Sequence, residues 1–307
     1  METKQRISRR LLTPIYRPFR SWFNIIFDKV ENNAILLGQT MSHIVTNGPP
    51  IDDLTKAEFK VFSQSGEDGI IQYLISKVPI ENEVFVEFGV GDYREANTRF
   101  LLMSNKWRGL VIDSSEKYVE SITHSSMFET WRLKATRSFI TRENINETIR
   151  AAGIEGDVGI LSIDIDGNDY WVWRAIDVIQ PRIVICEVNH HISPEHAITI
   201  PYQPDFNYGQ SHPSRVYFGA SLAALCHLAE EKGYSLVGCT SEGVNAFFVR
   251  KDVVGDLKTL NAKSGFEQIK NEISPPVSIH DRLKVIEDFE VYDVIANKTR
   301  RIRELIG

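Results

Sequence analysis

The strongest constraint on the fold is an apolar strand that ends in a glycine turn and precedes a second strand that ends in an acid. Val84–Phe88 leads into Gly89-Val90-Gly91, and the next apolar stretch ends at Asp113, 22 residues after Gly91. Glycines at such a turn let a ligand approach the backbone, because no Cβ stands in the way. A carboxylate at the end of the following strand can accept both hydroxyls of a ribose. The pattern therefore predicts a nucleoside-binding site.

The central part of the chain alternates between strand and helix patterns. Such alternation predicts right-handed βαβ units and a mostly parallel sheet with helices on both faces, which is a doubly wound α/β fold. Ligands in such sheets bind outside the carboxyl ends of the strands. The predicted strands are residues 84–88, 109–112, 158–165, 183–188, 234–237 and 246–249, with one more inside 131–140; the predicted helices are residues 62–78, 98–105, 117–121, 142–152, 170–176 and 221–232.

Composition and charge exclude several classes of protein. Hydrophobic residues make up 42% of the chain and charged residues 25%, which is typical of a globular protein rather than a disordered one. The net charge of −6 lacks the basic field that nucleic acid requires, so no nucleic-acid partner is expected. The phosphate-binding loop of P-loop ATPases does not occur in the sequence. Only three cysteines are present, which favours a reducing, cytoplasmic location.

Asn47-Gly48-Pro49-Pro50 is typical of a linker. It predicts an N-terminal extension (1–50), a central α/β domain (51–255) that carries the glycine turn, and a helical C-terminal extension (256–307). Within residues 1–30, seven basic and two acidic residues give a net charge of +5, and aromatic and aliphatic residues lie between them. Such a stretch predicts peripheral contact with the inner membrane surface; a helix docked on the domain is the alternative. Two prolines, Pro14 and Pro18, predict that any helix here is interrupted.

The charge around the glycine turn discriminates between nucleoside cofactors. Asp92 and Glu95 follow the turn, and Glu87 precedes it. A diphosphate binds best at a helix N-terminus without acidic side chains, because these repel its negative charge. The ammonium and sulfonium groups of S-adenosylmethionine are positively charged, so acidic side chains attract them. Arg94 also stands where a dinucleotide fingerprint has its third small residue. S-adenosylmethionine is therefore favoured. The alternatives are a nicotinamide-dependent oxidoreductase and a non-catalytic, membrane-associated protein of the same fold.

Three further segments, Ser63–Gly69, Glu95–Phe100 and Asp164–Tyr170, extend the pattern. With Glu87–Gly91 and Asp113, they resemble FkbM-like class I S-adenosylmethionine-dependent methyltransferases over about residues 60–252. The resemblance implies a Rossmann-like, seven-stranded sheet with an antiparallel last strand. It also implies an O-methyltransferase in glycan or natural-product biosynthesis. The implied cofactor residues are Gln64, Glu87, Gly89, Gly91, Asn97 and Asp113, with the adenine near Ala135–Arg137.

A second polar group follows the next two strands. Asp164 and Asp166 have the same strand parity, as do Glu187 and Asn189, and two histidines come next. If the strands are neighbours, these side chains form a cleft rich in carboxylates. Methyl transfer to a hydroxyl needs an aligned acceptor and a base, and hard oxygen ligands suit Mg²⁺. The candidate bases are His190, His191 and Asp166; Glu187 and Asn189 would orient the acceptor; the candidate metal ligands are Asp164, Asp166, Glu187 and Asn189.

A proline-rich and aromatic segment of about 30 residues follows Asn189. Long loops in compact domains are usually lids or binding loops, and aromatic faces suit a polyol. We therefore expect Tyr202, Tyr208 and His212 to contact the acceptor, a small molecule or a glycan. The sequence leaves the oligomeric state open, a homo-oligomer included.

Overall fold

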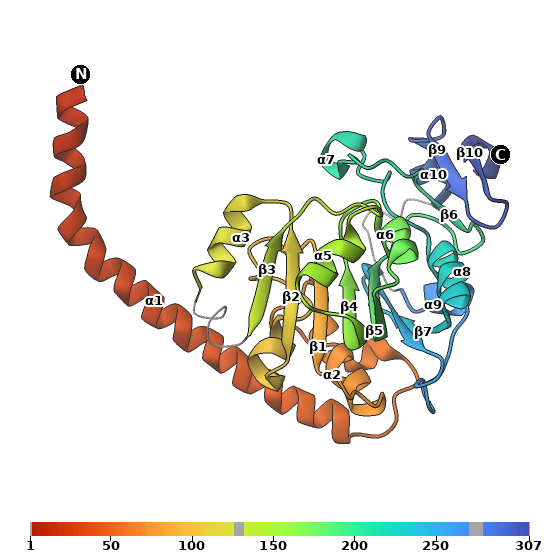
Figure 1. Cartoon of the computed structure of the whole chain (residues 1–307), viewed down its shortest axis with the longest axis horizontal. Coiled ribbons are helices and arrows are strands. Elements are labelled where there is room, and N and C mark those ends of the chain that lie inside the picture. The colour runs from red at the N-terminus through yellow and green to blue at the C-terminus, as the bar shows by residue number, and fades with distance from the viewer. Residues whose placement is uncertain (1, 126–131, 270–278, 307) are drawn as a thin grey trace.

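In the computed structural model, which describes residues 2–125, 132–269 and 279–306, a seven-stranded sheet forms the centre of the molecule (Figure 1). Its strands are β1 (Val84–Phe88), β2 (Arg108–Asp113), β3 (Leu133–Arg137), β4 (Gly156–Ile163), β5 (Ile179–Glu187), β7 (Tyr234–Cys239) and β8 (Asn245–Arg250). They lie in the order β3-β2-β1-β4-β5-β8-β7. The first five are parallel, and β8 is antiparallel to both of its neighbours.

This arrangement confirms the predicted Rossmann-like doubly wound fold with its antiparallel last strand. The chain crosses from one side of β1 to the other after β3, so the strand order reverses between β1 and β4. In open α/β sheets a crevice forms at the carboxyl ends of the strands on either side of such a reversal. The fold thus directs the search for a site to the ends of β1, β2, β4 and β5.

Helices cover both faces of the sheet because alternate strand residues point to opposite sides. Val84, Val86 and Phe88 of β1 belong to one buried cluster, and Phe85 belongs to the other. The first cluster includes residues of α5 (Ile145–Ala151), α6 (Asp169–Ala175) and α8 (Leu222–Lys232). The second includes residues of the 3-10 helix η1 (Leu54–Ala57), α2 (Glu67–Lys77), the π-helix η2 (Leu101–Asn105) and α3 (Glu116–Thr123).

One predicted helix starts later than its pattern suggested. The segment predicted as helical from residue 62 becomes α2 only at Glu67. The cause is Asp68, whose buried carboxylate accepts the backbone N–H groups of Val61, Phe62 and Ser63 at 2.7–2.9 Å. A backbone whose N–H groups point to one carboxylate cannot form the hydrogen bonds of a helix.

The C-terminal extension differs from the helical prediction. It contains α9 (Ala262–Phe266), α10 (Ile279–Lys284) and α11 (Arg303–Ile306), but also two strands, β9 (Glu290–Asp293) and β10 (Lys298–Arg301). β9 pairs with β10 on one side and with β6 (Ile198–Thr199) on the other, so the three strands form a second sheet of order β10-β9-β6. Ile198, Val291 and Ile302 share a small separate core. The long loop after β5, which also carries α7 (Tyr208–Ser211), therefore folds together with the C-terminal residues (Figure 1).

The N-terminal extension is one helix, α1 (Glu2–Asn47), so the predicted interruption at Pro14 and Pro18 is wrong. A proline inside a helix removes one N–H donor and its ring crowds the carbonyl four residues earlier, but a local bend relieves both while the surrounding turns persist. Gly38 brings the helix close to the domain, since a Cβ there would lie 2.5 Å from Val61 Cγ2. None of the helices in the described residues is long and apolar enough to cross a membrane.

Candidate functional site

Two adjoining cavities lie at the carboxyl ends of the central strands. The first, of about 370 Å³, is lined by residues that include Gly91 and Asp113. The second, of about 410 Å³, is lined by residues that include Glu87. Gly89, Asp164 and Asp166 line both, so the cavities share a wall at the point where the strand order reverses. The first cavity is lined by the end of β2, and the second by the end of β5.

The glycine turn after β1 is required by its geometry. Gly89 has a φ of +73°, and Gly91 has a φ of +54°, a region that residues with a Cβ avoid. A Cβ on Gly89 would lie 1.7 Å from the backbone carbonyl oxygen of Asp164. No atom lies within 4 Å of a Cβ built on Gly91. Gly89 therefore permits the contact between the ends of β1 and β4, and Gly91 leaves open space beside the first cavity.

Asp113 faces this turn from the end of β2. Its carboxylate accepts the N–H of Gly91 at 2.8 Å and the N–H of Ser115 at 2.7 Å. Each oxygen accepts one backbone donor and keeps lone pairs for others. The predicted pairing of glycine turn and acid is thus present, and the acid lies on the wall of the first cavity rather than in the protein interior.

The residues that follow β3 line the first cavity. Ser138, Phe139 and Ile140 line it together with Tyr118, whereas Ala135–Arg137, the segment expected near the adenine, do not. β3 continues through Arg137, so its carboxyl end comes only after that residue. A site at the end of a strand uses the residues that follow the strand, so the cavity is lined by the residues directly after the segment expected near the adenine.

Glu87 holds the loop that follows the glycine turn. Its carboxylate is buried and accepts the N–H of Asn97 at 2.8 Å, the N–H of Thr98 at 3.1 Å and the Thr98 hydroxyl. Burial raises the pKa of Glu87 to about 7, although these hydrogen bonds oppose the shift. Asn97 donates to the Ser162 hydroxyl at 3.1 Å. Glu87, Asn97 and the exposed Gln64 all line the second cavity.

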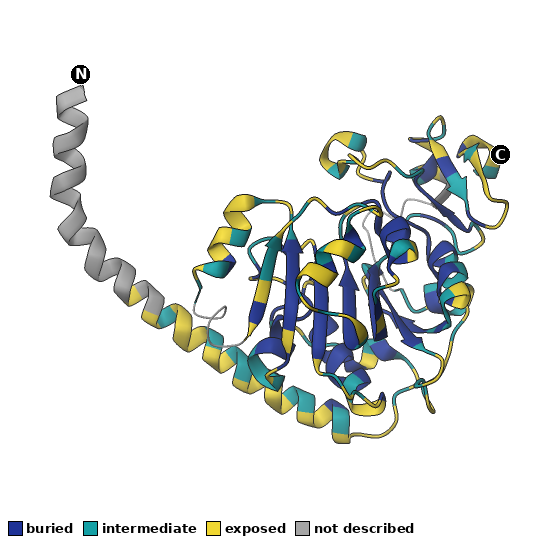
Figure 2. Cartoon of the chain, in the orientation of Figure 1, coloured by how far each residue is buried: buried dark blue, intermediate teal, exposed yellow. Residues whose placement is uncertain are grey.

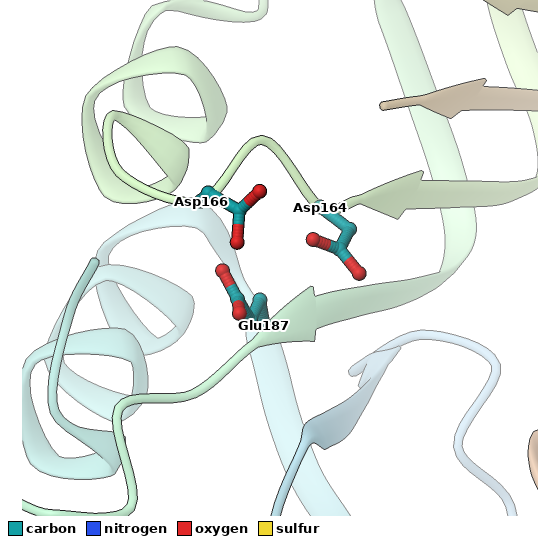
Figure 3. Close-up of side chains that lie close together, drawn as sticks. All are labelled: Asp164, Asp166 and Glu187. Atoms are coloured by element: carbon teal, nitrogen blue, oxygen red, sulfur yellow. The ribbon is translucent and has the colours of Figure 1, made fainter. Parts of the chain in front are cut away.

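Three carboxylates meet where the two cavities join (Figure 3). Asp164 follows β4, Asp166 lies in the turn beyond it, and Glu187 ends β5; each offers an oxygen within 4.8 Å of the others. Burial, with repulsion from Asp169 and Asp166, raises the pKa of Asp164 well above its usual range. Burial and Asp164 do the same to the pKa of Glu187. Glu187 Oε2 is buried and has no hydrogen-bond partner among the described residues.

The turn that carries Asp164 and Asp166 depends on Asp169, which sequence reasoning did not single out. The buried Asp169 carboxylate accepts the N–H of Ile165 and the N–H of Gly167, both at 2.8 Å. Asp166 lies between these two residues with a φ of +56°, a strained conformation that functional sites often contain. The only signal in the sequence was the position of Asp169 two residues after a glycine in a polar turn.

Two residues expected in the site have other partners. Asn189 is buried and donates to the carbonyls of Val216 and Phe218 at 2.9 and 2.8 Å, so it anchors the long loop instead of joining the carboxylates. His191 lies outside both cavities, and its Nδ1 is 3.1 Å from an Arg282 nitrogen. Burial, His190 and Arg282 lower the pKa of His191 to about 4.

His190 does line the second cavity. The centroids of its ring and that of His191 lie 4.3 Å apart, and burial lowers the pKa of His190, which favours the neutral imidazole. A neutral imidazole can accept a proton. Of the two histidines, the structure therefore brings only His190 to the carboxylates.

The long loop contributes one of its three expected residues. Tyr208 lines the second cavity, and its hydroxyl donates to the Arg215 carbonyl at 3.1 Å. Tyr202 lies away from both cavities, where its hydroxyl donates to Glu143. His212 packs against Phe289, with ring centroids 5.2 Å apart. Tyr202 and His212 take these positions because the loop packs against neighbouring segments. The sequence pattern of the loop did not indicate this packing.

Asn245 is a further cavity residue that sequence reasoning missed. It begins β8, lines the second cavity and donates to the Glu67 carboxylate at 2.9 Å. An apolar run, Ala246–Val249, follows it in β8, so the polar residue at the start of this run was the available signal. Because β8 pairs with β5, Asn245 lies directly opposite Glu187.

No family model and no curated protein matches the chain. Among solved structures, an S-adenosylmethionine-dependent methyltransferase from Clostridium acetobutylicum is 9% identical over 54% of this chain and 83% of that chain, with a TM-score of 0.33. The O-methyltransferase from Bacillus cereus in complex with SAH is 16% identical over 54% of this chain and 72% of that chain, with a TM-score of 0.33. The DszA carbon methyltransferase is 10% identical over 60% of this chain and 53% of that chain, with a TM-score of 0.38. These are distant likenesses, and the strand order itself carries the fold assignment.

Proposed function

We propose that this protein is an S-adenosylmethionine-dependent O-methyltransferase of the FkbM-like kind, which methylates a hydroxyl of a sugar, glycan-related or natural-product acceptor. One observation carries the proposal. A strand-end acid and a glycine turn line one cavity, and a second cavity lined with carboxylates adjoins it. A nucleoside with a cationic tail matches this sequence of surfaces.

The residues present fit such a cofactor. Asp113 would accept the ribose hydroxyls, and the wall formed by Ser138, Phe139 and Ile140 would hold the adenine. The methionine part would extend past Gly89 toward Glu87 and Asn97. The acids in the second cavity would attract its ammonium and sulfonium groups. When bound, S-adenosylmethionine supplies an electrophilic methyl group.

The acceptor hydroxyl would occupy the second cavity, near the carboxylates. Its oxygen forms a bond to the methyl carbon while the carbon–sulfur bond breaks, and the electron pair of that bond stays on sulfur. The hydroxyl proton goes to a base. His190 and Asp166 both line this cavity and are the proposed bases, while Tyr208 would contact the acceptor. Positioning of the two reactants is a large part of the rate enhancement in such a reaction.

In a competing chemistry, the three carboxylates would hold a divalent cation such as Mg²⁺, and His190 instead of Asp166 would then be the proposed base. Asp164, Asp166 and Glu187 offer hard oxygen ligands, and the unpartnered Glu187 Oε2 favours such a ligand. A bound Mg²⁺ supplies Lewis acidity, which lowers the pKa of a coordinated hydroxyl. Asn189, the fourth predicted ligand, is not included because its amide binds the long loop.

Thermal stability tests the cofactor. S-adenosylhomocysteine at 100 times its Kd should stabilise the protein by about 2.7 kcal/mol, because it binds only the folded state. A rise in Tm of several degrees is therefore expected with S-adenosylhomocysteine and none with NAD. Stabilisation by NAD alone would contradict the proposal and favour a nicotinamide-dependent oxidoreductase. No shift with either ligand would favour a non-catalytic protein.

The pH dependence of Tm tests the metal. Asp164, Glu187 and Glu87 have raised pKa values in the folded protein, so the folded state holds their protons more tightly than the unfolded state. The stability that these groups contribute is therefore present below about pH 4 and is lost as the pH rises above that value. The contribution of Glu87 is lost as the pH rises through about 7. Mg²⁺ replaces protons in the carboxylate cluster, so it should raise Tm more at pH 8 than at pH 5.

The matched variants are Glu187→Gln and Glu195→Gln. Glu187→Gln removes one ligand of the cluster and should abolish the Mg²⁺-dependent rise in Tm. Glu195 is exposed on the loop after β5 and lies outside the cluster, so its variant should respond like the wild type. An equal response of all three proteins would exclude the metal site.

A further inference from the structure

Large apolar side chains are exposed along α1. Val30, Leu37 and Ile44 are 62%, 65% and 56% exposed, and they are spaced by seven residues. Residues at this spacing lie on one face of a helix. Figure 2 shows exposed and half-buried positions along the described part of α1. Others of the same kind on α1 are Trp22, Ile25, Phe27 and Leu36.

A different face of α1 contacts the domain. Glu31 pairs with Arg99, Gly38 lies against Val61 and Phe100, and Val45 is buried. These three helix residues are also spaced by seven, one position after the exposed set. The exposed face is therefore turned by about 100° from the docked face, because α-helical residues advance by that angle. Docking of α1 on its own domain leaves the apolar face open.

The apolar spacing continues toward the N-terminus. Positions 12, 15, 19, 22 and 26 hold Leu, Ile, Phe, Trp and Ile, each three or four residues from the next. Positions 6, 10, 17 and 20 hold arginine, and none of them coincides with the apolar positions. An apolar face with a basic polar face is the pattern of helices that lie in the plane of a membrane surface.

We propose that α1 binds an anionic lipid surface, with its apolar face in the headgroup region and its basic residues at the phosphates. The charge distribution favours lipid over a second copy of the chain. Residues 1–30 carry +5, whereas the remaining chain carries −11. Two copies paired through α1 would bring two segments of +5 together, which repel each other. An anionic bilayer attracts the same segment, and each Lys or Arg near the surface adds to that attraction.

Vesicle sedimentation of the full-length protein tests the proposal. The lipids are phosphatidylcholine alone and phosphatidylcholine with phosphatidylglycerol. We expect binding to the anionic vesicles only, and weaker binding at high salt because salt screens the attraction. Arg17→Gln combined with Arg20→Gln should lower the partition coefficient about tenfold or more.

The apolar face is tested by Val30→Ser combined with Leu37→Ser. This variant should also lower the partition coefficient at least about tenfold, because two apolar side chains no longer leave water. The matched control is Ile295→Ser, which removes an apolar side chain that is 70% exposed outside α1 and should bind like the wild type. Circular dichroism checks that all variants keep their helix content.

Three results would overturn the proposal. One is equal sedimentation with neutral and anionic vesicles, and another is unchanged binding of the Val30→Ser and Leu37→Ser variant. The third comes from light scattering without lipid: a dimer that this variant dissociates would assign the face to a second copy of the chain.

Discussion

Gly89→Ala is expected to destabilise the protein strongly and to abolish cofactor binding. The new Cβ would lie 1.7 Å from the Asp164 carbonyl oxygen, which is backbone and cannot rotate away. The substitution also places alanine at a φ of +73°. Relief of the overlap requires the ends of β1 and β4 to separate, so we expect a loss of about 3 kcal/mol or more in the free energy of unfolding. Urea denaturation measures this loss, and calorimetry with S-adenosylhomocysteine measures the binding.

Gly91→Ala is the matched control for stability. Gly91 also has a positive φ, of +54°, but a Cβ there would meet no atom within 4 Å. Its substitution should cost only about 1 kcal/mol, the strain of the left-handed conformation. If the two variants lost the same free energy of unfolding, the close approach of β1 to Asp164 would not be the constraint that we infer.

Asp113→Ala should weaken the binding of S-adenosylhomocysteine by about 100-fold or more. Hydrogen bonds to a charged group contribute roughly 1.5–3 kcal/mol each, and the proposed ribose makes two of them. The variant also leaves the Gly91 N–H without its carboxylate partner, which loosens the turn. Isothermal titration calorimetry measures the change in Kd.

Two variants separate these effects of Asp113. Asp113→Asn keeps an oxygen that can accept from Gly91 but removes the charge, so its Kd should lie between those of wild type and Asp113→Ala. Asp92 lies in the same turn, pairs with Arg94 and lines neither cavity. The Asp92→Ala variant should therefore bind S-adenosylhomocysteine nearly as tightly as the wild type does. Similar losses in Asp92→Ala and Asp113→Ala would mean that the ribose does not bind at Asp113.

Local patterns in the sequence predicted the part of the site that depends on strand ends. A glycine turn after one parallel strand and an acid after the next must meet at one edge of the sheet, because parallel strands end on the same side. The meeting of Asp164 with Glu187 followed from the same rule, and β4 and β5 are indeed neighbours. Apolar runs and their periods located all seven strands of the main sheet.

Residues in loops were predicted less well, because hydrogen-bond partners distant in sequence decide their positions. Asn189 is drawn to carbonyls 27 and 29 residues away. His191 lies against Arg282, 91 residues later. No local pattern contains these partners, so polar residues after a strand were all expected in the cleft.

By itself, the sequence determined the layered α/β fold, the edge of the sheet that bears the site and the acidic character of its crevice. These features follow from hydrophobic periodicity and strand direction, which are properties of neighbouring residues. Only the tertiary structure decided which polar side chains reach the crevice, that the C-terminal residues add strands to the loop after β5, and which face of α1 stays exposed. These depend on contacts between distant segments, since most buried polar groups pair with a partner that the folded chain brings from elsewhere in the sequence.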